Sequence, residues 1–167
     1  IEAMSFRIQM LGGNPRLAHC LSTAAAMGGW QGGVAGSGQG IAAHMMHGAY
    51  GAVIVEAGMT GGRLSVGRIV AAVDCGDQIN PDIARQQIEG GLVYGLAAAM
   101  GASVSYERGL PTRAMLGRMG LPRLGDIGEV TVELIRSTAL PGSGAEIAAV
   151  LVAPAIANAL HTVTGQR

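Results

Sequence analysis

Two long apolar runs lie between residues 41 and 74, and they constrain the fold more than any other part of the chain. The first run, IAAHMMHGAYGAVIVEAGM, and the second, RLSVGRIVAAVD, are rich in strand-forming residues and are separated by Thr60, Gly61 and Gly62. Glycines supply the positive φ angles that a tight hairpin turn needs. The pattern therefore predicts two long antiparallel strands, and so a sheet at the centre of the fold.

Helices are predicted on both sides of this region. Asn followed by Pro favours a helix start, because Asn caps free amides and Pro at the first helical position loses no hydrogen bond. This signal predicts helices over residues 15–27 and 81–100. A third helix is predicted over residues 150–163 and ends at Gly165. The first eleven residues are typical of the end of a helix that began upstream.

The order of the elements indicates the fold class. A short strand over residues 102–107, a turn at Arg108 and Gly109, and an alternating strand over residues 130–135 complete the order β-β-α-β-β-α. This order predicts an α+β fold, with helices packed on antiparallel strands, rather than a doubly wound parallel sheet. The length of 167 residues predicts one domain over residues 1–167.

The composition excludes several classes of function. The net charge is zero and charged residues make up 13%, so no basic surface is available to hold a nucleic acid. Apolar stretches such as GLVYGLAAAMGASV fall short of the about 20 residues of a membrane span, so none is expected. The cysteines and histidines lack zinc-site or disulfide spacing, and no metal site is expected.

The apolar fraction of 49% is high for so few charges. An imbalance of this kind indicates that part of the surface is covered by other protein. A compact core rich in glycine and alanine is the alternative explanation.

The glycine-rich segment over residues 28–40 is predicted to be a loop. Together with Glu56 further along the chain, it imitates a dinucleotide-binding fingerprint. That fingerprint needs a helix directly after the turn, whereas the residues that follow here are typical of a strand. A dinucleotide-binding domain is therefore kept as a weaker alternative.

The segment VDCGDQINPDIARQQIEGGLVYGL places polar residues beside an apolar helix. Asp74 and Asp77 precede the helix, and Gln87 lies within it. Polar groups in such surroundings either have specific partners or remain solvated, and the sequence leaves both possibilities open. Gly91 and Gly95 in the same helix predict a close approach to another backbone.

The segment LPGSGAE ends on Glu146, and the residues that follow carry no charge. A carboxylate in apolar company is expected to be desolvated, which raises its pKa and suits it to proton abstraction near neutral pH. A structural role at the start of the helix is the equally weighted alternative.

Together these segments resemble the molybdenum hydroxylases, the family of xanthine dehydrogenase and aldehyde oxidase. The resemblance covers nearly the whole chain. It rests on GQGIAAH, on the VDCG segment, and on GSGAE followed by APAIANALHTVTG. The GIAAH strand and the ANA and TG ending favour the isoquinoline 1-oxidoreductase beta-subunit type. The resemblance implies the C-terminal molybdopterin-binding domain of that family, as the C-terminal part of its cofactor-binding subunit.

The resemblance also implies roles for single residues. Glu146 takes the position of the family's catalytic base, and Gln87 that of a glutamine that contacts the pterin. Ser143, Gly144 and Ala145 would bind the cofactor beside the metal centre. The implied activity is that of a molybdopterin-dependent oxidoreductase, which hydroxylates an aldehyde or an N-heteroaromatic substrate with oxygen from water.

The implied cofactor is molybdenum–molybdopterin, in the cytosine dinucleotide form, shared with a complementary N-terminal molybdopterin-binding chain. Iron–sulfur clusters would lie on a partner subunit, because this chain has only two cysteines. At Ala145 and Ile147 the sequence departs from the glycine and proline of the family. These departures favour the alternative of an inactive structural homologue that only completes a subunit interface.

Overall fold

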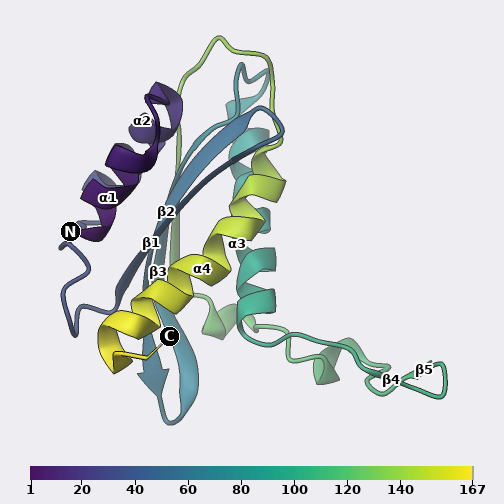
Figure 1. The fold of residues 1–167 in the computed structure, drawn as a ribbon. Coiled ribbons are helices and arrows are strands. Elements are labelled where there is room, and N and C mark those ends of the chain that lie inside the picture. Colours follow the sequence, from purple (N-terminus) through teal and green to yellow (C-terminus); the bar gives the residue numbers. More distant parts are fainter. Residues whose placement is uncertain (167) are drawn as a thin grey trace.

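A four-stranded sheet lies between two layers of helices in the computed structural model, which describes residues 1–166 (Figure 1). The strands follow the order β1-β2-β3-β6 across the sheet. Their bounds are β1 Gln39–Met46, β2 Ala49–Thr60, β3 Arg63–Asp74 and β6 Glu129–Leu134. Helices α1 (Ala3–Met10) and α2 (Pro15–Met27) lie on one face, and α3 (Pro81–Ala99) and α4 (Gly144–Thr164) on the other. The predicted α+β class is confirmed.

The sheet is mostly antiparallel. β1 pairs with β2 and β2 with β3 in antiparallel hairpins, whereas β6 adds to β3 in parallel. The first predicted strand is in fact two, because His47 and Gly48 adopt φ angles of 46° and 78° and turn the chain back. His is one of the few residues besides glycine that tolerates this left-handed conformation. The region predicted to form two strands therefore forms three, β1, β2 and β3.

The Asn-Pro signals locate two helices correctly. Asn14 accepts a hydrogen bond from the Leu17 amide at the start of α2, and Asn80 accepts two at the start of α3. Two other predicted starts are wrong. α1 begins at Ala3 with Glu2 as its N-cap, rather than continuing from upstream. α4 begins at Gly144, well before residue 150, because Ala, Glu and Ile continue the helical turn there.

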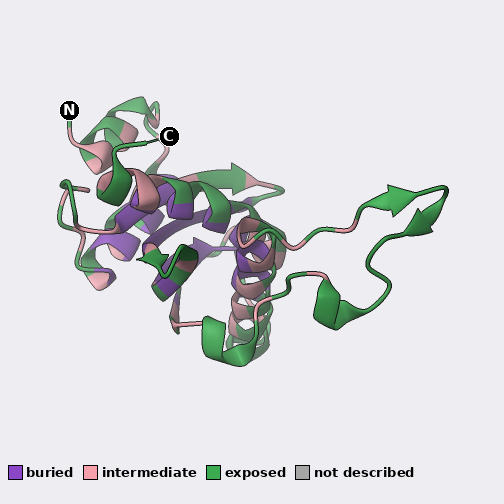
Figure 2. Ribbon diagram, turned by 90° about the horizontal axis from the view of Figure 1, so that it is seen from below, coloured by how far each residue is buried: buried purple, intermediate pink, exposed green. Residues whose placement is uncertain are grey.

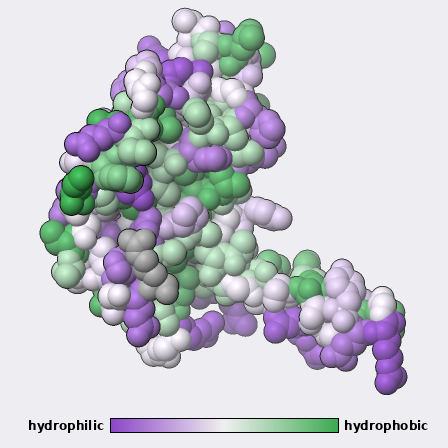
Figure 3. Space-filling view, in the orientation of Figure 1, coloured by the Kyte–Doolittle hydropathy of each residue, from purple (hydrophilic) through white to green (hydrophobic). Residues whose placement is uncertain are grey.

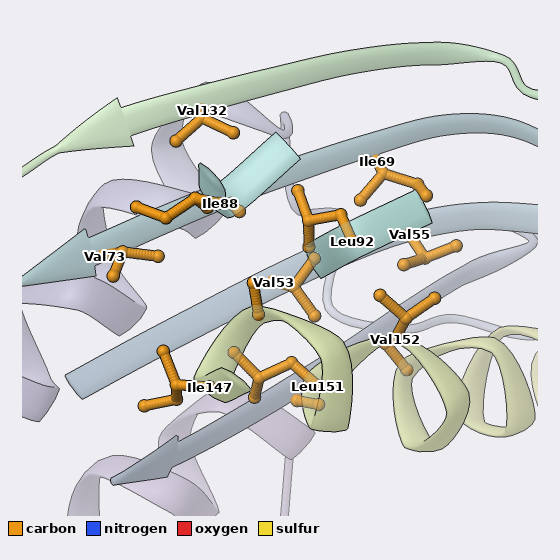
Figure 4. Packing of buried hydrophobic residues seen from close by; sticks show 14 of the residues in the cluster. Val53, Val55, Ile69, Val73, Ile88, Leu92, Val132, Ile147, Leu151 and Val152 are labelled. Atoms are coloured by element: carbon orange, nitrogen blue, oxygen red, sulfur yellow. The ribbon is translucent and has the colours of Figure 1, made fainter. Parts of the chain in front are cut away.

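The hydrophobic core fills both faces of the sheet. The larger cluster lies between the sheet and α3 and α4 (Figure 4). A smaller cluster lies under α2 and includes Leu21, Ile41 and Ile54. The sheet is thus buried on both faces, which explains why its strands form nearly continuous apolar runs.

Close packing of α3 on α4 depends on glycine. A Cβ atom on Gly91 would lie 2.2 Å from the carbonyl oxygen of Ala145, and one on Gly95 would lie 2.2 Å from that of Ala149. No side chain fits at either position. The predicted close approach of the α3 backbone to another backbone is confirmed.

α4 is long and apolar enough to cross a membrane by length and composition alone. It has 21 residues, with a mean hydropathy of 1.7 over its most apolar window. The expectation that no stretch reaches this length is therefore wrong. One side of α4 packs on β1, β2 and α3, with Ile147, Leu151 and Val152 buried, as in the core helix of a globular domain.

Residues 102–127 form an arm that extends away from the sheet (Figure 2). It contains the small hairpin of β4 (Tyr106–Glu107) and β5 (Leu110–Pro111) and the short 3₁₀ helices η1 (Leu116–Arg118) and η2 (Leu124–Asp126). The predicted turn is confirmed by φ angles of 51° at Arg108 and 80° at Gly109, but the strand before it is shorter than predicted. Most of the arm is exposed.

Candidate functional site

The loop before α4 is held between two turns of the sheet. The Gly142 amide donates a hydrogen bond of 2.8 Å to the Cys75 carbonyl, just after β3. The Ser143 amide donates one of 3.3 Å to the carbonyl of His47, in the turn between β1 and β2. Backbone contacts with both turns therefore fix where α4 begins.

Glycines allow this loop to approach so closely. A Cβ atom on Gly142 would lie 2.5 Å from the carbonyl carbon of Gly48. One on Gly76, which has a φ of 80°, would lie 2.2 Å from the Leu140 carbonyl oxygen. The glycines of this loop and of the β3–α3 connection are thus required by packing as well as by turn geometry.

Glu146 lies in the first turn of α4, with its side chain exposed. The hydroxyl of Ser143 donates a hydrogen bond to its Oε2. This hydrogen bond, with a smaller contribution from the backbone amide of Glu146, holds the pKa of the carboxyl below its usual value. The expected desolvation and raised pKa are wrong for this chain, because nothing within residues 1–166 covers the carboxylate.

A shallow hollow between α3 and α4 brings Gln87 and Glu146 together. Its volume is about 460 Å³, and it is lined by Gln86, Gln87, Gly90, Gly91, Tyr94, Ala145, Glu146 and Ala149. Three of the five predicted site residues therefore line this hollow: Gln87, Ala145 and Glu146. Ser143 joins them through its hydrogen bond to Glu146.

Gly144, the fifth predicted site residue, faces the core rather than the hollow. A Cβ atom there would lie 3.2 Å from Cγ1 of the buried Ile88, so its α-carbon points into the core. Its backbone amide, like that of Ala145, makes no hydrogen bond within residues 1–166. These residues can therefore contribute backbone donors to a ligand at the start of α4.

Tyr94 and His47 also belong to this region, although the sequence predicts a role for neither. Tyr94 follows Gln87, Gly90 and Gly91 at the spacing of one helix face, a signal that could have indicated it. His47 lies close enough to lower the pKa of Glu146 electrostatically. Its position could not be read from the sequence, because it depends on the turn that divides β1 from β2.

A separate pair of polar residues, Arg16 and Asp74, lies away from this hollow, at the end of β3 under α2. Arg16 donates hydrogen bonds of 2.6 Å from Nε and Nη2 to both carboxylate oxygens of Asp74, which is 3% exposed. Burial raises the pKa of Asp74, but the hydrogen bonds from Arg16 and the Gly76 amide outweigh it, and the pKa is lowered. The sequence left open whether the polar residues before α3 have specific partners or remain solvated. Asp74 has specific partners, whereas Asp77 is exposed.

The dinucleotide-binding alternative is wrong. The glycine-rich residues 28–40 lead into strand β1 and not into a helix. Glu56, the acidic residue of the imitated fingerprint, accepts a hydrogen bond of 3.2 Å from Nε2 of the buried Gln39. The segment therefore lacks the helix N-terminus on which that fingerprint depends.

Comparison with known proteins decides the family. The model of the molybdopterin cofactor-binding domain matches residues 22–128, which is more than half of the chain. The chain belongs to this family. The match includes Gln87 and ends before the loop that carries Glu146.

Relatives extend the similarity over the whole chain. It is 29% identical to the isoquinoline 1-oxidoreductase subunit beta of Brevundimonas diminuta, over 99% of this chain and 22% of that protein. Among solved structures it is similar to the Cu,Mo-CO dehydrogenase, with a TM-score of 0.60, 24% identity, and coverage of 70% of this chain and 16% of that one.

A second solved structure is similar to the chain. The quinoline 2-oxidoreductase of Pseudomonas putida 86 has a TM-score of 0.54 and 25% identity, with coverage of 67% of this chain and 15% of that one. The chain thus spans less than a quarter of the length of each of these three proteins.

The residues around the hollow fit the organic part of a molybdopterin cofactor. A pterin presents nitrogen and oxygen atoms that both donate and accept hydrogen bonds, and side-chain amides do the same. Gln86 and Gln87 offer such groups from α3, and Ala145 offers its backbone amide at the start of α4. Within residues 1–166 no three His, Cys, Asp or Glu side chains cluster, so this donor set suits the pterin rather than a directly bound metal.

Proposed function

We propose that this molybdopterin-binding domain supplies the Glu146-bearing part of a molybdenum-dependent hydroxylase, which oxidises an aldehyde or an N-heteroaromatic substrate with oxygen from water. The observation that carries the proposal is the hollow between α3 and α4, where Gln87 and Glu146 meet although they are far apart in sequence. The names of the isoquinoline and quinoline oxidoreductases support the class of substrate.

Four residues would hold the cofactor. The side-chain amide of Gln87 would bind the pterin, and the start of α4 would contribute the backbone of Gly144 and Ala145 and the hydroxyl of Ser143. When bound, the molybdenum cofactor supplies the two-electron oxidation of the substrate. We assign it the cytosine dinucleotide form by analogy with the isoquinoline oxidoreductase type.

Glu146 would act as the general base. Its lowered pKa keeps the carboxylate ionised at neutral pH, so it is ready to accept a proton. Ser143 donates to one carboxylate oxygen, Oε2, and the other oxygen makes no hydrogen bond within residues 1–166. Covering the hollow with protein would exclude water, raise the pKa of Glu146 and strengthen it as a base.

Other polypeptides would complete the enzyme. The hollow is open and shallow, and the chain corresponds to 22% of the isoquinoline 1-oxidoreductase subunit. We therefore propose that a complementary molybdopterin-binding chain covers it. Electrons from the substrate would pass to iron–sulfur clusters on a separate subunit, since the two cysteines of this chain are buried and lie in different core clusters.

The test is Glu146→Gln in the assembled enzyme, with Glu133→Gln on the exposed side of β6 as the matched control. Loss of a general base lowers turnover by about 10²- to 10⁴-fold. We expect this loss for Glu146→Gln with unchanged molybdenum and pterin content, and normal turnover for the control. Normal turnover of Glu146→Gln would refute the assigned role.

A second candidate is an inactive homologue that only completes a subunit interface. The hydrogen bond from Ser143 and the helix start already stabilise the Glu146 carboxylate without any ligand, which favours this alternative. Metal and pterin analysis of the purified complex separates the two candidates. Stoichiometric molybdenum with pterin supports the enzyme, and their absence supports the structural homologue.

A further inference from the structure

Strand β1 forms one edge of the sheet, and its backbone groups alternate between facing β2 and facing outwards. The Ala57 amide donates a hydrogen bond of 2.8 Å to the Gly38 carbonyl, which fixes which residues of β1 bond to β2. By this alternation Gly40, Ala42 and His44 face β2. Gln39, Ile41, Ala43 and Met45 therefore direct their amides and carbonyls away from the sheet.

The outward groups at the start of β1 have partners in the chain. The Ile41 carbonyl accepts hydrogen bonds from Nη2 of Arg7 at 3.2 Å and from Nδ2 of Asn158 at 2.9 Å. The Gln39 amide donates to Ser37 Oγ at 3.2 Å. Two side chains, one from α1 and one from α4, thus close the edge at Ile41.

Beyond Ile41 the edge is open. Within residues 1–166 the amides and carbonyls of Ala43 and Met45 make no hydrogen bond. A hollow of about 350 Å³ lies beside them, lined by Arg7, Ala42, Ala43, His44, Val150, Leu151, Pro154 and Asn158. Residues of α1 and α4 therefore flank a short open stretch of edge, large enough for the side chains of an added strand.

The other edge strand, β6, is protected by charged groups, whereas β1 has such a group only at Ile41, from Arg7. Arg85 of α3 donates a hydrogen bond to the Val132 carbonyl, and Glu129 forms an ion pair of 3.8 Å with Arg68. Charged groups of this kind prevent pairing at a sheet edge. β1 has the sequence QGIAAHMM, with no Asp, Glu, Lys, Arg or Pro. Its pairing with β2 is also free of bulges.

We propose that residues 43–46 of β1 pair with an extended segment from the remainder of the molybdenum subunit, which adds a strand to the sheet. The relative from Brevundimonas diminuta has 78% of its length outside the matching part, because this chain covers only 22% of it. Polypeptide for an added strand is therefore present in such a subunit. The lining of this hollow is largely apolar, with Ala42, Ala43, Val150, Leu151 and Pro154, and its charged group, Arg7, already bonds to Ile41. The hollow therefore suits a largely apolar segment.

Backbone pairing would supply the affinity of this contact. Ala43 and Met45 together offer two donors and two acceptors to an added strand. The hydrogen bonds from Arg7 and Asn158 to Ile41 mark where the added strand must stop. The inference rests on the proposed function only for the identity of the partner, because the open edge exists whether or not the enzyme is active.

The first test is Ala43→Pro in the assembled enzyme, with Ala43→Val as the matched control. Proline removes the outward amide of residue 43 without touching the hydrogen bonds between β1 and β2. Valine keeps the amide and suits a strand. We expect the affinity of the chain for the rest of the subunit to fall at least about tenfold for proline and to change less than about twofold for valine. Equal affinities would overturn the proposal.

Amide hydrogen exchange in the assembled wild-type enzyme gives a readout that does not depend on a variant folding. We expect the Ala43 and Met45 amides to be protected to a similar degree as that of His44, which pairs with β2. Exchange as fast as at Gly109 in the exposed arm would overturn the inference.

The exchange result also separates this inference from the proposed function. An enzyme that contains no molybdenum but protects Ala43 and Met45 contradicts the function and supports the added strand. Protection in a complex that contains only copies of this chain, measured by mass, would overturn the assigned partner.

Discussion

The two faces of the sheet are packed by different means. On the α3/α4 face, Gly91 and Gly95 let two helix backbones meet, and the contacts there are almost wholly apolar. On the α1/α2 face, an ion pair joins the buried Asp74 to Arg16, whose side chain is 28% exposed, next to small and apolar residues. Added atoms on the α3/α4 face should therefore lower the stability of the fold, whereas on the α1/α2 face the loss of one charge should do so.

Breaking the ion pair from one side has the largest expected effect. Arg16→Met leaves the Asp74 carboxylate buried without its cation, and such changes cost about 3–5 kcal/mol of unfolding free energy. Urea unfolding of the chain measures the loss. The double variant Arg16→Met with Asp74→Asn removes both charges, and we expect it to recover most of the stability. A double variant as unstable as the single one would contradict this account of the face.

Adding atoms to the other face has the next largest effect. Gly91→Val places a side chain where the Ala145 carbonyl lies, and we expect a loss of about 3 kcal/mol in unfolding free energy. The neighbouring Gly90 has open space around its α-carbon. Gly90→Ala should therefore stabilise the helix by about 0.5–1 kcal/mol. Similar losses for both variants would show that the helix contact is less close than described.

Acid should weaken the α1/α2 face more than the α3/α4 face. The pKa of Asp74 is lowered, and hydrogen bonds from the Met4 and Ser5 amides outweigh burial and lower the pKa of Glu2 to about 2. Both groups contribute stability that is present above their unfolded values of about 4 and is lost as the pH falls through their folded values.

Unfolding free energy measured between about pH 5 and pH 2 checks this prediction. We expect it to fall with pH in the natural chain, and to fall less steeply in a variant that carries Glu2→Gln together with Arg16→Met and Asp74→Asn. Parallel slopes would assign the acid sensitivity to other carboxylates.

The arm, residues 102–127, packs on neither face of the sheet. Substitutions in it should therefore have the smallest effect on the unfolding free energy. Leu124 is 89% exposed, so Leu124→Ser removes almost no buried area. We expect a change within about 0.5 kcal/mol in unfolding free energy. A larger loss would mean that the arm packs on the sheet region in solution, contrary to the extended arrangement (Figure 3).

Local signals in the sequence located most of the fold. Asn14 and Asn80 determine two helix starts through their own side chains, so short-range chemistry was sufficient to predict them. The turn at His47 was missed because a histidine with positive φ is uncommon and leaves no pattern. The parallel addition of β6 was missed because it depends on where α3 and the arm return the chain.

The candidate site was predictable in its residues but not in its surroundings. Resemblance indicated Gln87 and Glu146, and the structure brings them to one hollow. The exposure of Glu146 could not be inferred, since an apolar sequence around a carboxylate does not say which side of the helix the carboxylate occupies. The first turn of α4 directs it away from the buried Ile147.

The loop held between the two turns of the sheet also sets an order of events during folding. Ser143 contacts His47, and Gly142 contacts Cys75, across long stretches of chain. Contacts between such distant segments form late, because closing long loops costs entropy before any contact repays it. We therefore expect the start of α4, which carries Glu146, to be fixed only after both turns of the sheet have formed. A cofactor that binds beside Glu146 would then bind the folded domain.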